Sequence, residues 1–124
     1  MLIKKFEDIR SWQISRELVR EVYSISSKGA LAKDFGLKDQ MRRAAGSIMH
    51  NIAEGFGSGS RPEFIRFLRY AQRSATELMS QLYIALDQAY ITQDQFEQLR
   101  KLAEDAHATI GGFIKHLQTK KPTG

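Results

Sequence analysis

Cysteine is absent from the 124 residues and proline occurs only twice. The missing thiols exclude disulfide frameworks, thiolate metal sites and cysteine nucleophiles. No apolar run approaches the ~18 consecutive residues that a membrane span requires. The N-terminal stretch reaches Glu7 and Asp8 before any apolar segment, so we expect no signal peptide. These absences predict a cytoplasmic protein with no membrane partner.

The net charge and the length of the chain bear on its partners and on its number of domains. Nineteen Lys and Arg against fourteen Asp and Glu give a net charge of +5. That surplus permits a polyanion as partner without requiring one. The length suits one domain with one hydrophobic core. We expect that domain to span residues 1–118 and the tail over 119–124 to fray.

Helical periodicity dominates the pattern, and no segment alternates with the period of a strand. The first predicted helix covers about 8–27 and begins near Asp8. Its apolar residues spread over half of its circumference, which indicates more than one neighbour. The second covers about 37–56 and ends at the glycine cluster that follows.

Two capping boxes mark the remaining helices. Ser60 and Glu63 have the reciprocal spacing that opens a helix, and an apolar seam continues from there to Ala89. Thr92 and Gln95 repeat the spacing, and a fourth seam runs to Leu117. Four amphipathic helices with rather short loops predict an all-α, antiparallel up-down-up-down four-helix bundle.

A row of polar side chains borders the apolar seam of the second helix. The third helix carries a matching row, so antiparallel packing would let Arg43 and Asn51 meet Glu77 and Ser74. We interpret these rows as a structural network that sets helix register, with a ligand pocket as the alternative. Gly46, in mid-helix, is predicted to mark a close helix approach. The predicted network comprises Gln40, Arg43, Ser47, Asn51, Glu54, Ser74 and Glu77.

Arg66, Arg69 and Arg73 share the outward face of the third helix. Three guanidinium groups over two turns suit a row of phosphates, because each offers forked donors and stays protonated. Tyr70 lies to one side and is a candidate for base stacking. The alternative is a solvated face on which Arg73 pairs with Glu77.

Weaker candidates for phosphate contact are Arg16 and Arg20 on the first helix and Arg42 on the second. Zinc fingers, RNP aromatic pairs and basic zippers are all missing. Nucleic-acid binding would therefore read backbone and shape rather than bases.

Enzymatic signals are weak. Glu104 and His107 have the Glu-x-x-His spacing of di-iron bundles, but such a centre needs a second copy and two further carboxylates. No serine has a nucleophile-elbow context, and the glycine cluster lacks the strand and lysine of a P-loop. We predict no catalytic residues, no metal and no cofactor, and keep a di-metal enzyme as a remote alternative.

Four segments carry a resemblance to a known family: FEDI at 6–9, FGL at 35–37, QMRRAA at 40–45 and NIAEG at 51–55. The chain is similar, over about 6–117, to the four-helix bundle family of 23S ribosomal RNA intervening-sequence proteins, which is related to accessory variability proteins of diversity-generating retroelements. The resemblance implies a cyclic homo-oligomer, a homopentamer. For the retroelement branch it also implies binding to nucleic acid and to a reverse transcriptase.

Together these patterns predict a non-enzymatic accessory or scaffold protein that binds the backbone of RNA or DNA through arginines. The alternative is a protein-interaction adaptor whose arginine face is only solvated. Binding to nucleic acid should weaken steeply with salt, whereas an adaptor should bind a protein partner without nucleic acid.

Overall fold

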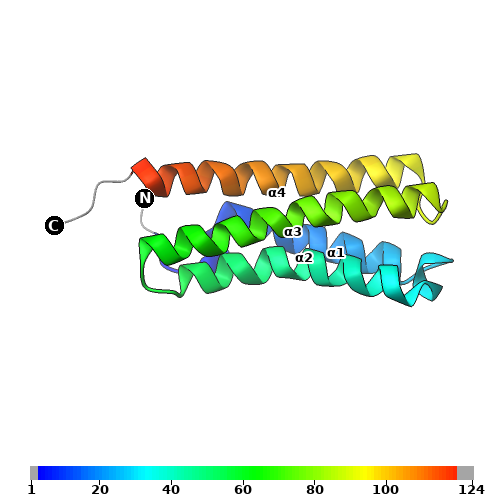
Figure 1. Cartoon of the computed structure of the whole chain (residues 1–124), viewed down its shortest axis with the longest axis horizontal. Helices are drawn as coiled ribbons and strands as arrows, with labels where there is room; N and C mark the ends of the chain where they lie inside the picture. Colours follow the sequence, from blue (N-terminus) through cyan, green and yellow to red (C-terminus); the bar gives the residue numbers. More distant parts are fainter. Residues whose placement is uncertain (1–2, 120–124) are drawn as a thin grey trace.

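Four antiparallel helices make up the computed structural model, which describes residues 3–119 (Figure 1). No strand occurs in this range, so the predicted all-α, up-down-up-down bundle is confirmed. Two short 3-10 turns precede the first two helices. The elements are η1 (Phe6–Asp8), α1 (Arg10–Ser26), η2 (Leu31–Lys33), α2 (Phe35–Phe56), α3 (Arg61–Asp87) and α4 (Gln93–Thr119).

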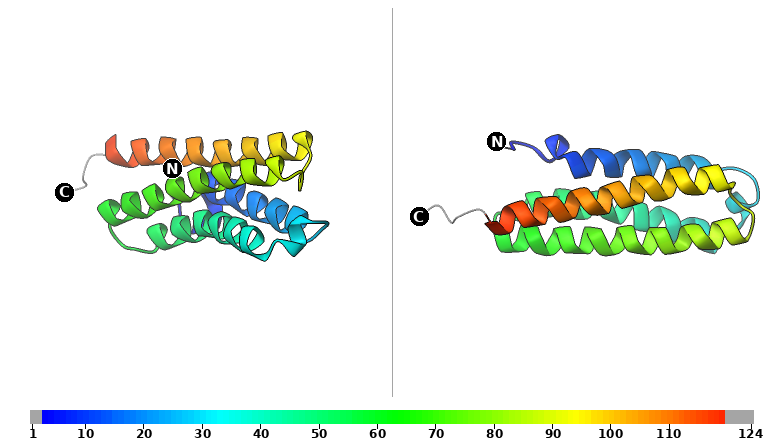
Figure 2. Two further views of the ribbon diagram at one scale, coloured as in Figure 1. Left: turned by 45° about the vertical axis from the view of Figure 1, so that its right-hand side comes forward. Right: turned by 90° about the horizontal axis from the view of Figure 1, so that it is seen from above.

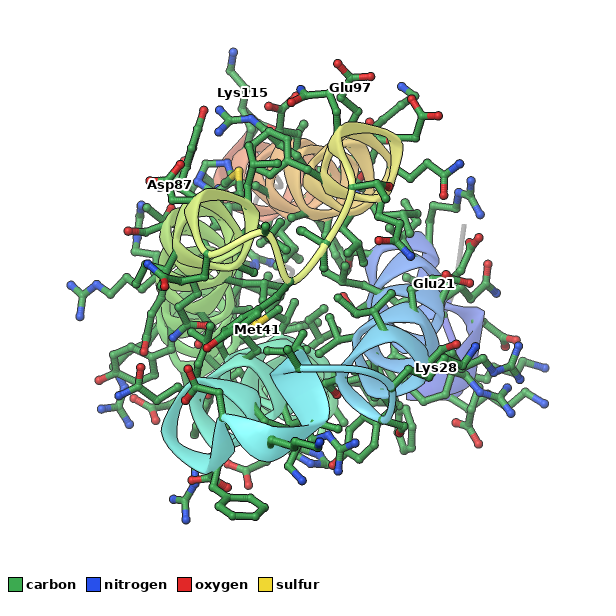
Figure 3. All side chains as sticks on the ribbon, turned by 90° about the vertical axis from the view of Figure 1, so that its right-hand side faces the viewer. Glu21, Lys28, Met41, Asp87, Glu97 and Lys115 are labelled. Atoms are coloured by element: carbon green, nitrogen blue, oxygen red, sulfur yellow. The ribbon has the colours of Figure 1, made fainter. Side chains whose placement is uncertain are left out.

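Each helix packs against the two helices beside it. α1 contacts α2 and α4, and α3 contacts the same two helices from the opposite corner. The end-on view in Figure 3 shows α1 and α3 as the diagonal pair, and Figure 2 shows the same order from two further sides. Fully buried aliphatic side chains from every helix fill the centre. They include Leu18, Val22, Met41, Ile48, Ile52, Leu68, Leu78, Leu82 and Ile110.

The first helix begins at Arg10, so the prediction of a start near Asp8 is wrong. Phe6–Asp8 instead form a 3-10 turn, and no side chain caps α1. Ile9 is only 2% exposed, and the Phe6 and Trp12 rings meet edge to face at 5.2 Å. Burial of these apolar groups outweighs the preference of one acidic side chain for a helix start.

α2 begins at Phe35, two residues before its predicted start. The Asp34 carboxylate caps it by accepting from the Leu37 amide at 3.1 Å. At the start of α3 the Ser60 hydroxyl accepts from the Glu63 amide at 3.2 Å. Such caps satisfy amides that lack a partner within the helix.

The second capping box forms in both directions at the start of α4. Thr92 Oγ1 accepts from the Gln95 amide at 3.1 Å, and Gln95 Oε1 accepts from the Thr92 amide at 2.8 Å. α3 stops at Asp87, before its predicted seam ends, because Ala89 has φ 60°. The amides of Ala89 and Tyr90 then close a Schellman motif, which terminates the helix.

The close approach between helices lies at Gly55, and the prediction for Gly46 is wrong. A Cβ atom on Gly46 would meet only His50 of its own helix, at 3.8 Å. A Cβ atom on Gly55 would lie 2.8 Å from Phe64 Cδ1 and 2.9 Å from Phe67 Cβ. Gly55 therefore lets the end of α2 pack directly on the first turns of α3.

Candidate nucleic-acid interface

The outward face of α3 exposes all three predicted arginines, but Arg66 is already engaged. Its Nη2 donates to Glu63 at 2.7 Å, and its Nη1 donates to the Tyr70 hydroxyl at 3.2 Å. The hydrogen bond to Glu63 is the largest cause that raises the pKa of Arg66 above its ordinary value. A phosphate at Arg66 would compete with this carboxylate.

Tyr70 is also engaged, because two guanidinium groups lie over its ring. The Cζ atoms of Arg66 and Arg73 are 5.6 and 5.7 Å from the ring centroid. Phe67 packs edge to face at 6.0 Å. A base could stack on Tyr70 only by displacing cation–π contacts, so the arrangement does not favour the predicted stacking role.

Arg69 and Arg73 differ from Arg66, since neither makes an ion pair within residues 3–119. The alternative pairing of Arg73 with Glu77 does not form, and Glu77 instead accepts from Gln81 Nε2 at 3.3 Å. The two exposed guanidinium groups therefore keep their charge uncompensated by a carboxylate in contact.

A shallow groove of about 280 Å³ between α3 and α4 brings these two arginines together with other donors. Gln72 spans it and donates from Nε2 to the His107 carbonyl at 3.3 Å. Gly111 gives Gln72 this room, because a Cβ atom there would lie 3.0 Å from that nitrogen. The groove, called the α3–α4 groove below, is lined by Arg69, Gln72, Arg73, Thr76 and His107.

Sequence reasoning placed His107 on the surface and outside the site. A usable signal was nevertheless present, since residues equally distant from the turn over 88–92 face each other in an antiparallel hairpin. Tyr83 packs edge to face on Phe96 by this rule, with ring centroids 4.9 Å apart, and Gln72 meets His107 by the same rule.

Glu104 lies one turn before His107 on α4. Arg100 Nε donates to it at 2.6 Å, and Arg100 Nη1 donates to the Tyr83 hydroxyl at 2.9 Å. The Glu104 charge is thus held by a neighbouring cation. Over the described range, no three His, Asp or Glu side chains gather to hold a metal ion.

The three weaker arginine candidates do not join this surface. Arg42 connects α1 to α2, donating to the hydroxyls of Ser26 at 2.8 Å and Ser27 at 3.0 Å. Arg16 and Arg20 are exposed on α1, diagonally across the bundle from α3. The groove beside them also contains Glu7, Glu17 and Glu21. The six predicted arginines therefore do not form one continuous surface.

The predicted polar network is only partly assembled. Ser74 Oγ donates to Ser47 Oγ at 2.8 Å, and Asn51 Nδ2 donates to the Ser47 carbonyl at 2.8 Å and to its hydroxyl at 3.0 Å. These three side chains link α2 to α3. A short neutral network of this kind avoids the desolvation of a buried charge.

The predicted meeting of Arg43 with Glu77 is wrong. Arg43 donates to Asp39 one turn earlier, at 2.8 Å, and its side chain is 80% exposed. Pairing within one helix leaves the guanidinium in water, whereas a pair between helices would have to be desolvated. Gln40 and Glu54 are also exposed and lie outside the network.

Over residues 3–119, none of the helices combines the length and the apolar character needed to cross a bilayer. The family model described as "23S rRNA-intervening sequence protein" matches residues 7–112. A solved structure of a protein of unknown function from the S23 ribosomal protein family, from Bacteroides thetaiotaomicron, has 28% identity and a TM-score of 0.77. The similarity covers 85% of this chain and 95% of that one. No curated protein matches.

Proposed function

The chain belongs to the family of 23S rRNA-intervening sequence proteins, and from this premise we propose that it is a non-enzymatic accessory protein that binds the backbone of RNA or DNA. The observation that carries the proposal is the pair Arg69 and Arg73. Both are exposed and have no carboxylate partner among residues 3–119, and they line one groove with three further polar side chains. Guanidinium forks in such a setting suit phosphate oxygens.

Assembly would strengthen this role. The family resemblance implies a homopentamer, and five copies of a chain with net charge +5 carry +25 on one particle. A field of that size raises the rate and strength of polyanion binding at low salt. In the retroelement branch a reverse transcriptase would be a further partner. We propose a cytoplasmic location, where RNA and DNA would both be accessible.

Salt dependence tests the proposal. We expect binding of labelled structured RNA and duplex DNA to fall linearly on a log–log plot between about 50 and 200 mM salt. Replacing Arg69 and Arg73 together with alanine should flatten the duplex slope by about 1.8, since each lost phosphate contact contributes about 0.9. Fluorescence anisotropy at several salt concentrations measures both slopes.

The double substitution Arg16→Ala/Arg20→Ala is the matched control. It removes the same charge from the diagonal helix and should change the slope less. Equal slopes in both variants would mean that only net charge matters. Absence of binding at every salt concentration, with a protein partner retained after nuclease treatment, would favour the adaptor instead. Bound iron or manganese in stoichiometric amount would favour the di-metal enzyme.

A further inference from the structure

The α3–α4 groove is unusual in presenting hydrogen-bond donors with no carboxylate among its lining residues. Arg69 and Arg73 each offer a forked set of N–H groups. Gln72 keeps one amide hydrogen beyond the one it gives to the His107 carbonyl. The Thr76 hydroxyl donates to the Gln72 carbonyl at 3.2 Å, so it contributes shape rather than a donor. Such a lining favours an anion and disfavours a cation.

Carboxylates flank the positively charged stretch of α3 on both sides. Glu63 lies before it, paired with Arg66, and Glu77 is exposed one turn after Arg73. One helical turn rises about 5.4 Å. A nucleic-acid strand that continued along the helix would therefore carry its next phosphate toward a carboxylate. The geometry suits one concentrated charge better than an extended row of phosphates.

No exposed aromatic platform accompanies the groove. Its lining contains no Phe, Tyr or Trp, and the neighbouring Tyr70 ring lies beneath two guanidinium groups. Proteins that grip single strands along their length generally stack bases on aromatic side chains. The groove is therefore suited to recognise the charge and the oxygen atoms of a ligand, and not its bases.

We propose that the α3–α4 groove binds a terminal phosphate monoester of a nucleic-acid strand through Arg69, Arg73, Gln72 and His107. A terminal phosphate carries nearly two charges near neutral pH, because its second ionisation occurs at about pH 6. It presents three free oxygens, whereas an internal phosphodiester presents two and a single charge. The forked N–H groups of the two guanidinium groups match the three free oxygens of a terminal phosphate. This inference rests on the proposed nucleic-acid binding and specifies its ligand.

The test uses the full chain and one short single-stranded RNA prepared with a 5′-phosphate, a 3′-phosphate or hydroxyl ends. Anisotropy titrations at roughly pH 7.5 keep the terminal phosphate dianionic. We expect a terminal phosphate to tighten binding by about tenfold, the effect of one charge-assisted hydrogen bond or more. Equal gains in affinity from a 5′-phosphate and from a 3′-phosphate would support recognition of the phosphate monoester itself. Added inorganic phosphate should compete for the groove and so reduce the gain in affinity.

Substitutions of the groove residues test whether the gain in affinity for phosphorylated RNA arises in the α3–α4 groove. Arg69→Ala/Arg73→Ala should remove the preference, so that this variant binds phosphorylated and hydroxyl-ended RNA with equal affinity. Gln72→Glu nearly preserves side-chain size but places a carboxylate in the groove, and it should abolish the preference as well. The control Arg16→Ala/Arg20→Ala should keep the tenfold ratio. Helical circular dichroism verifies that each variant is folded.

The outcomes separate this inference from the proposed function. If phosphorylated and hydroxyl-ended RNA bind equally, and the groove arginines weaken both alike, the terminal-phosphate site is wrong and backbone binding stands. If none of the RNAs binds, both proposals fail. A terminal-phosphate preference that survives Arg69→Ala/Arg73→Ala would overturn the assignment to this groove.

Discussion

Gly46 and Gly55 occupy the same helix but have opposite surroundings. A Cβ atom on Gly46 would make only ordinary van der Waals contact with His50 of the same helix, whereas Gly55 faces two phenylalanines of α3. Alanine at Gly46 should therefore stabilise the fold by up to about 1 kcal/mol through helix propensity. Alanine at Gly55 should destabilise it by about 1–3 kcal/mol, because Phe64 and the α3 backbone have to move.

Urea denaturation followed by helical circular dichroism measures both changes in the free energy of unfolding. Each variant serves as the control for the other, since the chemical change is identical. A destabilised Gly46→Ala, or an unaffected Gly55→Ala, would contradict the packing at these two positions.

The surroundings of individual residues are also what the sequence predicts least well. Both glycines interrupt similar helical patterns, and only the identity of the neighbouring helix surface separates them. In the same way, Arg66, Arg69 and Arg73 were correctly placed on one exposed face by their spacing. Their availability depends on side-chain partners that periodicity does not specify.

At the scale of elements, Asp34 connects the start of α2 to the turn between α3 and α4. Its Oδ1 caps the Leu37 amide, and its Oδ2 accepts from the Tyr90 hydroxyl at 3.0 Å. That hydrogen bond is the largest cause raising the pKa of Tyr90 above its ordinary value, followed by desolvation and the charge of Asp34. One side chain thus serves two elements.

A raised pKa means that the folded state holds the phenol proton more tightly than the unfolded state. The resulting stabilisation is complete below the unfolded pKa and is lost as pH rises through the higher folded pKa. We expect Asp34→Asn to lower the pKa of Tyr90, because the carboxylate charge is removed while the amide oxygen still caps α2.

Alkaline titration of tyrosine absorbance measures this shift, and Tyr90→Phe identifies which transition belongs to Tyr90. The circular dichroism signal must remain helical over the range used. An alkaline curve that is unchanged in Asp34→Asn would show that the hydrogen bond has no effect on the phenol.

Elements were predicted more completely than their ends. Apolar seams gave four helices because one side of each must be buried. The capping boxes located two helix starts, since their chemistry is local. The end of α3 was missed because the apolar seam continues past the left-handed Ala89. The start of α1 was missed because the burial of Ile9 depends on tertiary contacts. His107 was missed for the same reason: α4 supplies it to a groove whose other lining residues belong to α3.

At the scale of the whole molecule, the family resemblance leads us to expect five copies of the 14.2 kDa chain. Partly exposed apolar side chains on separate helices offer surfaces for such contacts, among them Tyr23 at 46% and Ile84 at 49%. Light scattering coupled to gel filtration gives the particle mass directly. We expect five times the chain mass at low and at moderate salt.

A particle mass equal to one chain would mean that assembly does not multiply the net charge. Nucleic-acid affinity would then depend on the +5 of a single copy and on the groove alone. Measuring mass at the same salt concentrations as binding keeps the two effects apart.

The order of the helices around the bundle has a topological consequence. Ile3 lines one cavity with Phe113 and His116, so the first described residues lie beside the last turns of α4 (Figure 1). α1 and α4 are already neighbours, and the four helices form a closed ring of antiparallel hairpins. A circular permutant that links the two ends and opens at the turn between α1 and α2 would keep every helix next to the same partners. Only the α1–α2 connection would be given up, and the α3–α4 groove would stay within one uninterrupted hairpin.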